Sequence, residues 1–263
     1  GPYRILKELG RGASGRVFLC QHTGLGLQHA VKVLALEGAQ NPESMERFKR
    51  ETIMLSTVDH PGIVKVHAAG FWNAQPYFAM DYVKGVTLRA AQKEGLPLDQ
   101  VLDVIEELAL ALGHVHSKGL VHRDVKPANV MVCEGHARLT DFGLAKLLGV
   151  RSQRLTQTGD LLGTPAYMAH EQADPAVGEI SPATDVFALG AMVYQAFEGL
   201  PPFYCDSGVD IYRRLRRREP APALKSPEAN GQIRLLCERA LAINPRRRYP
   251  NGLAFYRALA EAR

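Results

Sequence analysis

The segment His122–Asn129 reads H-R-D-V-K-P-A-N and places a carboxylate, an ammonium group and an amide close together in the chain. Asp141 follows twelve residues after Asn129, in the triplet D-F-G. Phosphoryl transfer requires a carboxylate that accepts the proton of the attacking hydroxyl, a cation near the moving phosphoryl group and oxygen ligands for Mg²⁺. We therefore predict that Asp124 accepts the proton, that Lys126 supplies the cation, and that Asn129 and Asp141 bind the metal.

These residues resemble the catalytic loop and metal motif of the eukaryotic-type (Hanks-type) protein serine/threonine kinases, and their wording is most similar to bacterial members. The resemblance covers essentially residues 3–263. It implies an α+β, bilobal protein-kinase-like fold, with a small β-rich N-lobe that has one helix and a larger α-rich C-lobe. We expect residues 1–263 to form a single catalytic domain, with the N-lobe at about 3–81, the hinge at 82–85 and the C-lobe at about 86–263.

A glycine-rich turn near the start of the chain supports the resemblance. Residues 10–17 read G-R-G-A-S-G-R-V and lie between two strand-like runs, 3–9 and 16–20. Dinucleotide-binding sites use the same glycine spacing, but they need a helix directly after the glycines. A second β-type run follows here, so the pattern favours a hairpin that covers nucleotide phosphates. Lys32 comes in the next strand-like run, H-A-V-K, and the resemblance implies that it reaches the α- and β-phosphates.

A helix from Glu43 to about Val58 is predicted by apolar residues at helical spacing, with Asn41 as its N-cap and Pro42 at its first position. Glu51 in this helix has two interpretations. It could be a solvent-facing charge beside two basic residues, or it could pair with Lys32, as the resemblance implies. We favour the pair, because the family register places Glu51 there without gaps.

The resemblance also implies an ATP site. Apolar side chains would enclose the adenine ring, a gatekeeper methionine would line the back of its pocket, and backbone groups after the fifth strand would meet its edge. The resemblance places Met80 at this gatekeeper position. Met80 could also be an ordinary residue of the hydrophobic core, and the two interpretations are compatible. The residues assigned to nucleotide binding are Gly10, Gly12, Gly15, Val17, Ala30, Lys32, Met80, Asp81, Val83 and Met131. The expected metal is Mg²⁺, with Mn²⁺ as an alternative.

The segment after the D-F-G triplet bears on substrate and activation. Residues 163–168 read G-T-P-A-Y-M, the serine/threonine form of the segment that holds the substrate in the resembling family. The run L-T-Q-T resembles the paired-threonine activation segment of bacterial kinases, so we predict autophosphorylation at Thr156 or Thr158. Such phosphorylation in trans would need two copies to meet as a homodimer. Arg123 would bind the added phosphate.

One motif departs from the family pattern. The family ends its substrate segment with Ala-Pro-Glu, whereas this chain has histidine at the middle position, His170. We expect a softer segment there, because proline fixes φ and lacks a backbone donor. Glu171 remains available to pair with Arg248, and Asp185 is expected to anchor the backbone of the catalytic loop.

Composition narrows the class of protein. The 46% share of hydrophobic residues is typical of a globular chain, and no apolar run approaches the ~20 residues that span a bilayer. Four scattered cysteines without C-x-x-C spacing favour a reducing compartment over a disulfide framework or zinc site. We expect a cytoplasmic location, which includes the intracellular domain of a larger membrane-anchored protein, and we take the chain to be a truncated catalytic part.

The net charge of +5 comes partly from arginine clusters at 213–218 and 246–248. We interpret the first cluster as a solvated helix face. An acidic docking partner or substrate ranks second and nucleic acid a distant third, because no aromatic residues are interleaved with the arginines and no nucleic-acid motif accompanies them.

Two other classes of function stay open from the sequence. A pseudokinase scaffold would lack one of the groups needed for transfer, yet Lys32, Asp124, Asn129 and Asp141 are all present. A small-molecule phosphotransferase would typically lack the T-P-x-Y and A-x-E segment, which this chain retains. The favoured hypothesis is an ATP-dependent kinase that transfers the γ-phosphate of Mg-ATP to serine and threonine hydroxyls of proteins.

Overall fold

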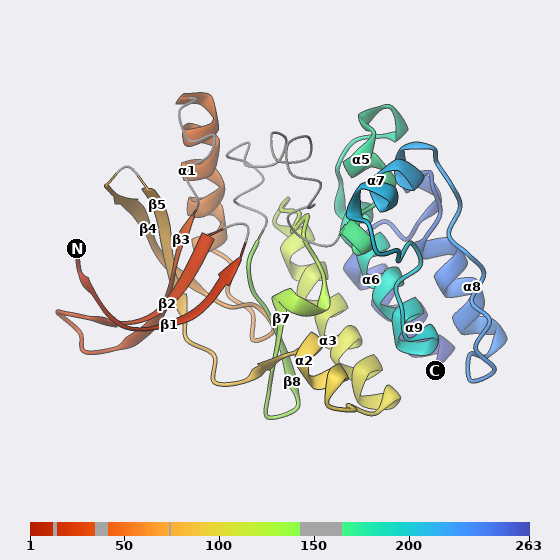
Figure 1. Cartoon of the computed structure of the whole chain (residues 1–263), viewed down its shortest axis with the longest axis horizontal. Coiled ribbons are helices and arrows are strands. Elements are labelled where there is room, and N and C mark those ends of the chain that lie inside the picture. Colours follow the sequence, from red (N-terminus) through yellow and green to blue (C-terminus); the bar gives the residue numbers. More distant parts are fainter. Residues whose placement is uncertain (13–14, 35–41, 74, 143–164) are drawn as a thin grey trace. The chain divides into compact units, whose positions relative to one another are not determined.

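The computed structural model describes residues 1–12, 15–34, 42–73, 75–142 and 165–263 (Figure 1). These residues divide into two compact units. The first is Gly1–Lys84, and the second combines Gly85–Phe142 with the described residues of Thr164–Arg263.

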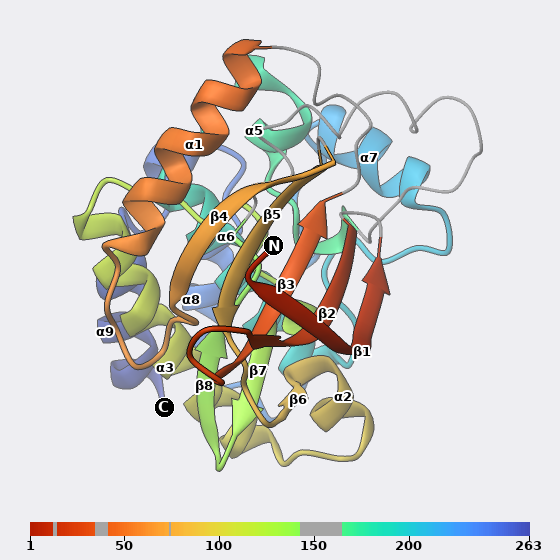
Figure 2. The ribbon, with the colours of Figure 1, turned by 90° about the vertical axis from the view of Figure 1, so that its left-hand side faces the viewer.

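The first unit is built on an antiparallel sheet of five strands in the order β1-β2-β3-β5-β4 (Figure 2). Its elements are β1 (Tyr3–Gly12), β2 (Gly15–His22), β3 (Gln28–Leu34), α1 (Pro42–Ser56), β4 (Val66–Trp72) and β5 (Gln75–Asp81). Both views show α1 beside the sheet, and within the unit it packs mainly against β4. The predicted strands and the predicted helix are confirmed, with ends that shift by a few residues.

Side chains alternate between the two faces of β3, as the period of a strand requires. Val31 belongs to a buried cluster with Cys20 and Ala79 on one face. Ala30 and Lys32 occupy the intervening positions, so they point to the opposite face, and both are buried. In the H-A-V-K run, Val31 therefore packs in the core of the sheet on one face, while Ala30 and Lys32 lie on the other face.

The second unit is mainly helical, with a small sheet in the order β6-β7-β8 (Figure 1). Its helices are α2 (Leu88–Lys93), α3 (Leu98–Ser117), α5 (His170–Ala173), α6 (Pro182–Glu198), α7 (Gly208–Arg216), α8 (Gly231–Ala240) and α9 (Gly252–Ala262). Its strands are β6 (Val86–Thr87), β7 (Val130–Cys133) and β8 (His136–Leu139). Short 3₁₀ turns occur at Pro127–Asn129, Pro165–Tyr167, Pro175–Val177 and Pro245–Arg247.

Helix α6 forms the centre of this unit. Every residue from Ala183 to Tyr194 is buried, because α3, α8 and α9 all contact this helix. It begins at Pro182, since proline suits the first turn of a helix. It ends at Glu198, and its C-cap Gly199 has a φ of 78°. Among the described helices, none combines the length and apolar character needed to cross a membrane.

Helices α3 and α9 approach most closely at Gly252. A Cβ atom added there would lie 2.4 Å from the carbonyl oxygen of Ala109 and 2.6 Å from the backbone nitrogen of Gly113. Both neighbours are backbone atoms of α3, so a side chain could be accommodated only by moving one helix away from the other.

We therefore predict that Gly252→Ala lowers the free energy of unfolding by about 1–3 kcal/mol, the usual cost of overpacking. Urea denaturation would measure the change. The matched control is Gly231→Ala at the start of α8, where nothing lies within 4 Å of an added Cβ. Equal stability of the two variants would contradict the close approach.

Candidate active site

The carboxylate of Asp124 lies between a cation and an amide. Lys126 Nζ is 2.7 Å from Asp124 Oδ2, and Asn129 Nδ2 donates to the same oxygen at 2.9 Å. The Asn129 amide also donates to the Asp124 carbonyl at 2.8 Å. The side chains of Asp124 and Lys126 are each 25% exposed, so a substrate can reach them. The structure thus brings together three of the residues predicted to carry chemistry.

Proline sets the local geometry of this loop. Lys126 has extended backbone angles, φ −168° and ψ 159°, because a residue before proline avoids the helical region. Pro127 then begins the 3₁₀ turn Pro127–Asn129, which returns Asn129 toward Asp124. The K-P-A-N sequence therefore folds the loop back on itself.

Arg123, directly before Asp124, has a φ of 68°. This left-handed conformation is costly for a residue with a side chain, by about 1–3 kcal/mol, unless its surroundings hold it. The side chain of Asp185, from α6, provides that support. Its Oδ1 accepts from the Arg123 N–H at 2.8 Å and its Oδ2 accepts from the His122 N–H at 2.7 Å. The predicted anchoring role of Asp185 is confirmed.

His116 is a site residue that sequence reasoning missed. Its Nδ1 accepts from the Gly252 N–H at 3.1 Å, so its proton is on Nε2, which donates to Asp185 Oδ2 at 2.9 Å. The side chains of His116 and Asp185 are 2% and 1% exposed. The available signal was a histidine in the last turn of the amphipathic helix α3, a turn that also contains His114.

His122 connects the catalytic loop to the D-F-G segment. Its Nδ1 accepts from the Asp124 N–H at 3.2 Å, and its Nε2 donates to the Thr140 carbonyl at 3.0 Å. The ring is fully buried, 4.6 Å from that of Phe142. These contacts give the His122 ring a packing role between the two segments. A further hydrogen bond runs from Thr140 N to Asn129 O at 2.9 Å. Because Asp141 directly follows Thr140, this bond ties the backbone next to Asp141 to Asn129.

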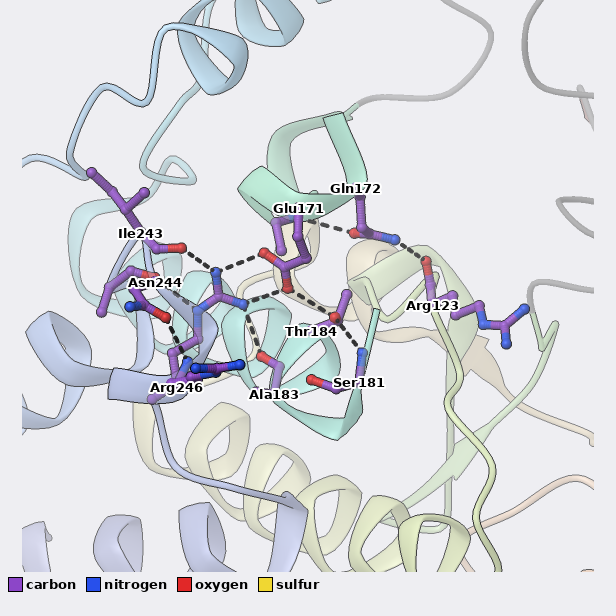
Figure 3. A network of polar contacts seen from close by, with 12 residues as sticks. Arg123, Glu171, Gln172, Ser181, Ala183, Thr184, Ile243, Asn244 and Arg246 are labelled. Atoms are coloured by element: carbon purple, nitrogen blue, oxygen red, sulfur yellow. Dashed lines mark hydrogen bonds and ion pairs between the residues drawn. The ribbon is translucent and has the colours of Figure 1, made fainter. Parts of the chain in front are cut away.

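The pair of Glu171 and Arg248 joins distant parts of the second unit, and Figure 3 shows the contacts around Glu171. Arg248 uses all five of its N–H donors. Two bind the carboxylate of Glu171 at 2.7 and 2.8 Å, and three bind the carbonyls of Ala183, Ala242 and Ile243. Both charged side chains are fully buried. The predicted pair is confirmed, and Arg248 differs from the exposed neighbours Arg246 and Arg247.

His170 occupies a buried aromatic environment. It is fully buried, and its ring packs edge-on against the rings of Phe187 and Phe203, at 5.6 and 5.5 Å between centroids. Its Nε2 lies 2.9 Å from the Glu219 carbonyl, to which it donates. The expectation of a softer segment stays a prediction, while the contacts of the imidazole tie the start of α5 to Phe187, Phe203 and Glu219. Burial lowers the pKa of His170 below its ordinary value.

The first unit contains most of the residues predicted to bind nucleotide. In the strand register Val17 lies opposite Lys32, and Ala30 lies opposite Met80. Gly15 has a φ of 138°, and a Cβ there would lie 2.0 Å from the Val33 carbonyl oxygen, so the hairpin requires glycine. Hydrogen bonds from Arg16 and Arg11 to Glu8 flank this turn and lower the pKa of Glu8 to about 2.

The remaining predicted site residues lie on different elements or outside the described residues. Glu51 lies half-buried on α1 in the first unit, and Met131 lies on β7 in the second. Lys32, on β3, is 7% exposed. Thr156, Thr158 and Thr164 lie outside the described residues.

The arginine cluster on and after α7 makes surface ion pairs. Arg213 pairs with Asp210 at 2.9 Å, Arg214 with Glu219 at 2.9 Å and Arg218 with Asp174 at 3.2 Å. These contacts agree with the interpretation of the cluster as a solvated face.

Breaking the buried pair should be costly, because the remaining charge would have no compensation. We predict that Arg248→Met lowers the free energy of unfolding by about 3–5 kcal/mol, measured by urea denaturation. The control is Arg213→Met, which removes an ion pair whose side chains are 66% and 54% exposed. This variant should change stability little. A small effect of Arg248→Met would show that the buried pair is dispensable for folding.

The lowered pKa of His170 predicts a pH dependence of stability. In the unfolded chain a histidine titrates near about 6.5, so the unfolded state binds this proton more tightly than the folded state. The contribution of the neutral imidazole is complete above that pH and falls as the pH drops toward the lowered pKa. His170→Gln can still donate to the Glu219 carbonyl but does not titrate, so it should flatten the loss of stability below pH ~6.5.

Urea denaturation of the parent and the variant across this pH range would measure the difference. His136→Gln is the control, since that side chain is 77% exposed, and it should keep the dependence of the parent. An unchanged pH dependence in His170→Gln would contradict the assignment.

Comparison with known proteins agrees with this geometry. The protein kinase domain family matches residues 3–252. The serine/threonine-protein kinase PknA of Mycobacterium tuberculosis is 38% identical, over 100% of this chain and 62% of its own length. PknB of Mycolicibacterium smegmatis is 34% identical over 94% of this chain and 40% of its own length. The chain thus spans less than two thirds of the length of these relatives.

The fold is also that of solved kinase domains. The crystal structure of the Mycobacterium tuberculosis PknI kinase domain, C20A mutant, superposes with a TM-score of 0.80 at 30% identity, covering 100% of this chain and 96% of that one. The predicted α+β protein-kinase fold class is confirmed. The chain therefore belongs to the protein kinase domain family, and the similar full-length relatives are bacterial serine/threonine-protein kinases.

Proposed function

We propose that this chain is the catalytic domain of an ATP- and Mg²⁺-dependent serine/threonine kinase whose substrates are proteins. The observation that carries the proposal is the arrangement at Asp124, where a partly exposed carboxylate contacts the Lys126 ammonium and the Asn129 amide. A second copy of the chain would be one such substrate. We also propose that residues 3–81, 82–85 and 86–263 act as N-lobe, hinge and C-lobe. The division between compact units after Lys84 supports this assignment.

Asp124 would orient the substrate hydroxyl and accept its proton during transfer. Lys126 would stabilise the negative charge that develops on the transferred phosphoryl group. Because Asp124 and Lys126 are held together at 2.7 Å on a loop anchored by Asp185, little reorganisation is needed when a substrate binds. Positioning and electrostatic stabilisation carry most of the rate in such sites.

The residues proposed to bind metal fit a hard divalent cation. Asn129 uses its amide nitrogen on Asp124, so its amide oxygen is the atom suited to a metal, and Asp141 adds a carboxylate. No group of three His, Cys, Asp or Glu side chains suited to a metal occurs within the described ranges. This small ligand set favours Mg²⁺, which commonly binds one or two protein oxygens together with nucleotide phosphates, and Mn²⁺ is the alternative. When bound, the metal would neutralise charge on the β- and γ-phosphates.

Nucleotide would bind through the first unit and Met131. Lys32 would bind the α- and β-phosphates and pair with Glu51, under a loop formed by Gly10, Gly12 and Gly15. The adenine ring would contact Val17, Ala30 and Met131, beside Met80 and the backbone of Asp81 and Val83. The burial of Lys32 on the sheet face away from the Cys20 cluster supports this role, because a buried lysine needs an anionic neighbour.

We also infer a cytoplasmic location, where ATP is available. The four cysteines are all free, which agrees with a reducing compartment.

The experiment is to incubate the purified chain with Mg-ATP and to map its phosphosites by mass spectrometry. We expect phosphate on Thr156 or Thr158 in the parent and none in Lys32→Met. Asp141→Asn should reduce transfer at least ~100-fold while the fold, followed by circular dichroism, stays intact. An unmodified parent that also leaves a generic basic protein untouched would favour a pseudokinase scaffold and contradict the proposal.

A further inference from the structure

Gln172 bridges two segments that are far apart in the sequence. It is the third residue of α5, and its Oε1 accepts from the Ala169 N–H at 3.1 Å. Its Nε2 donates to the carbonyl oxygen of Arg123 at 2.9 Å, as Figure 3 shows. The two partners fix the orientation of the amide, since a backbone N–H can only donate and a carbonyl can only accept.

The bond to Arg123 acts on the peptide that leads into Asp124. That planar peptide carries the Arg123 carbonyl oxygen at one side and the Asp124 N–H at the other. Gln172 holds the oxygen, and His122 Nδ1 holds the N–H at 3.2 Å. Rotation of this peptide plane would break both hydrogen bonds.

The same peptide follows the strained residue of the loop. Arg123 has a φ of 68°, and its N–H is held by Asp185 while its carbonyl is held by Gln172. Without Gln172, of the two hydrogen bonds on the peptide plane only the one from the Asp124 N–H to His122 Nδ1 would remain, so ψ of Arg123 would be held less firmly. Because that angle directs the chain into Asp124, relaxation would displace the carboxylate from Lys126.

The two residues before Gln172 are anchored by buried contacts. Its neighbour Glu171 is held by Arg248 in the buried pair, and His170 donates to the Glu219 carbonyl. The first two residues of α5 are therefore each held by contacts of their own.

We propose that Gln172 is a positioning residue for phosphoryl transfer, which holds the Arg123–Asp124 peptide in its productive orientation. The inference rests on the proposed kinase function. Gln172 contacts neither of the groups assigned to proton transfer or charge stabilisation, so it acts through the backbone of the loop. A purely structural role at the start of α5 is the competing explanation.

Two variants separate these explanations. Gln172→Met keeps the size of the side chain and removes both hydrogen bonds. Gln172→Glu keeps an acceptor for the Ala169 N–H but, when ionised, cannot donate to the Arg123 carbonyl. We expect kcat to fall about tenfold in both at neutral pH, the size of one lost hydrogen bond, with KM for ATP and thermal stability close to those of the parent.

The pH profile gives a readout that a structural role would not move. As the pH falls toward the pKa of the introduced Glu side chain, the protonated acid regains a donor for the Arg123 carbonyl. The ratio of kcat for Gln172→Glu to that of the parent should therefore rise at acidic pH, while the ratio for Gln172→Met stays flat. Asp174→Asn, at the end of the same helix, is the control and should keep the kcat of the parent.

Amide hydrogen exchange tests the link without activity. Gln172→Met should speed exchange in residues 122–126, and Asp174→Asn should not. Unchanged exchange, or an unchanged kcat in both Gln172 variants of an active parent, would overturn the inference. A flat ratio for Gln172→Glu or a kcat loss that only follows a loss of thermal stability would overturn it too. A parent chain that transfers no phosphate would instead contradict the proposed function.

Discussion

The buried carboxylate of Asp185 supports the backbone on which the rest of the site is built. It accepts from the N–H groups of His122 and Arg123 and from His116 Nε2. A buried carboxylate is costly unless its oxygens are hydrogen-bonded, and here three donors meet that need. These hydrogen bonds keep Arg123 in a left-handed conformation that an isolated chain would leave. The orientation of Asp124, the next residue, depends on the hydrogen bonds to Asp185.

A second set of buried polar contacts, centred on Arg248, joins α5 to α6. Arg248 brings together the carboxylate of Glu171 and the backbone carbonyls of Ala183, Ala242 and Ile243, so three chain segments meet at one guanidinium group. Its planar fork of five donors suits this task in a way that a lysine could not. Glu171 in turn accepts from the Thr184 hydroxyl, one residue from Asp185 on α6. Helix α6 thus supports both the catalytic loop and the segment that ends in α5.

His170 shows how a departure from a family motif can be accommodated. Proline at this position would restrict φ, whereas histidine uses its side chain to fill a space between two phenylalanine rings and to bind the Glu219 carbonyl. Proline would restrain this position through its backbone, whereas histidine restrains it through the contacts of its side chain. Its consequence is a titratable group inside the unit, with a pKa lowered by burial.

The sequence by itself determined the order of the elements and the residues of the catalytic loop. Their signals are local: the β-type runs around the glycines, the apolar stripe of α3, and K-P-A-N, where proline forces an extended Lys126 and a turn. Only the tertiary structure decided which polar groups hold that loop. Gln172 and Gly252 lie far from Asp124 in the chain, and the partners of His116, Asp185 and Gly252, are 69 and 136 residues away from it, so no periodicity or motif marks these contacts. Hydrogen bonds of that kind exist only after α3, α6 and α9 have packed, because packing alone brings the donors and acceptors within reach.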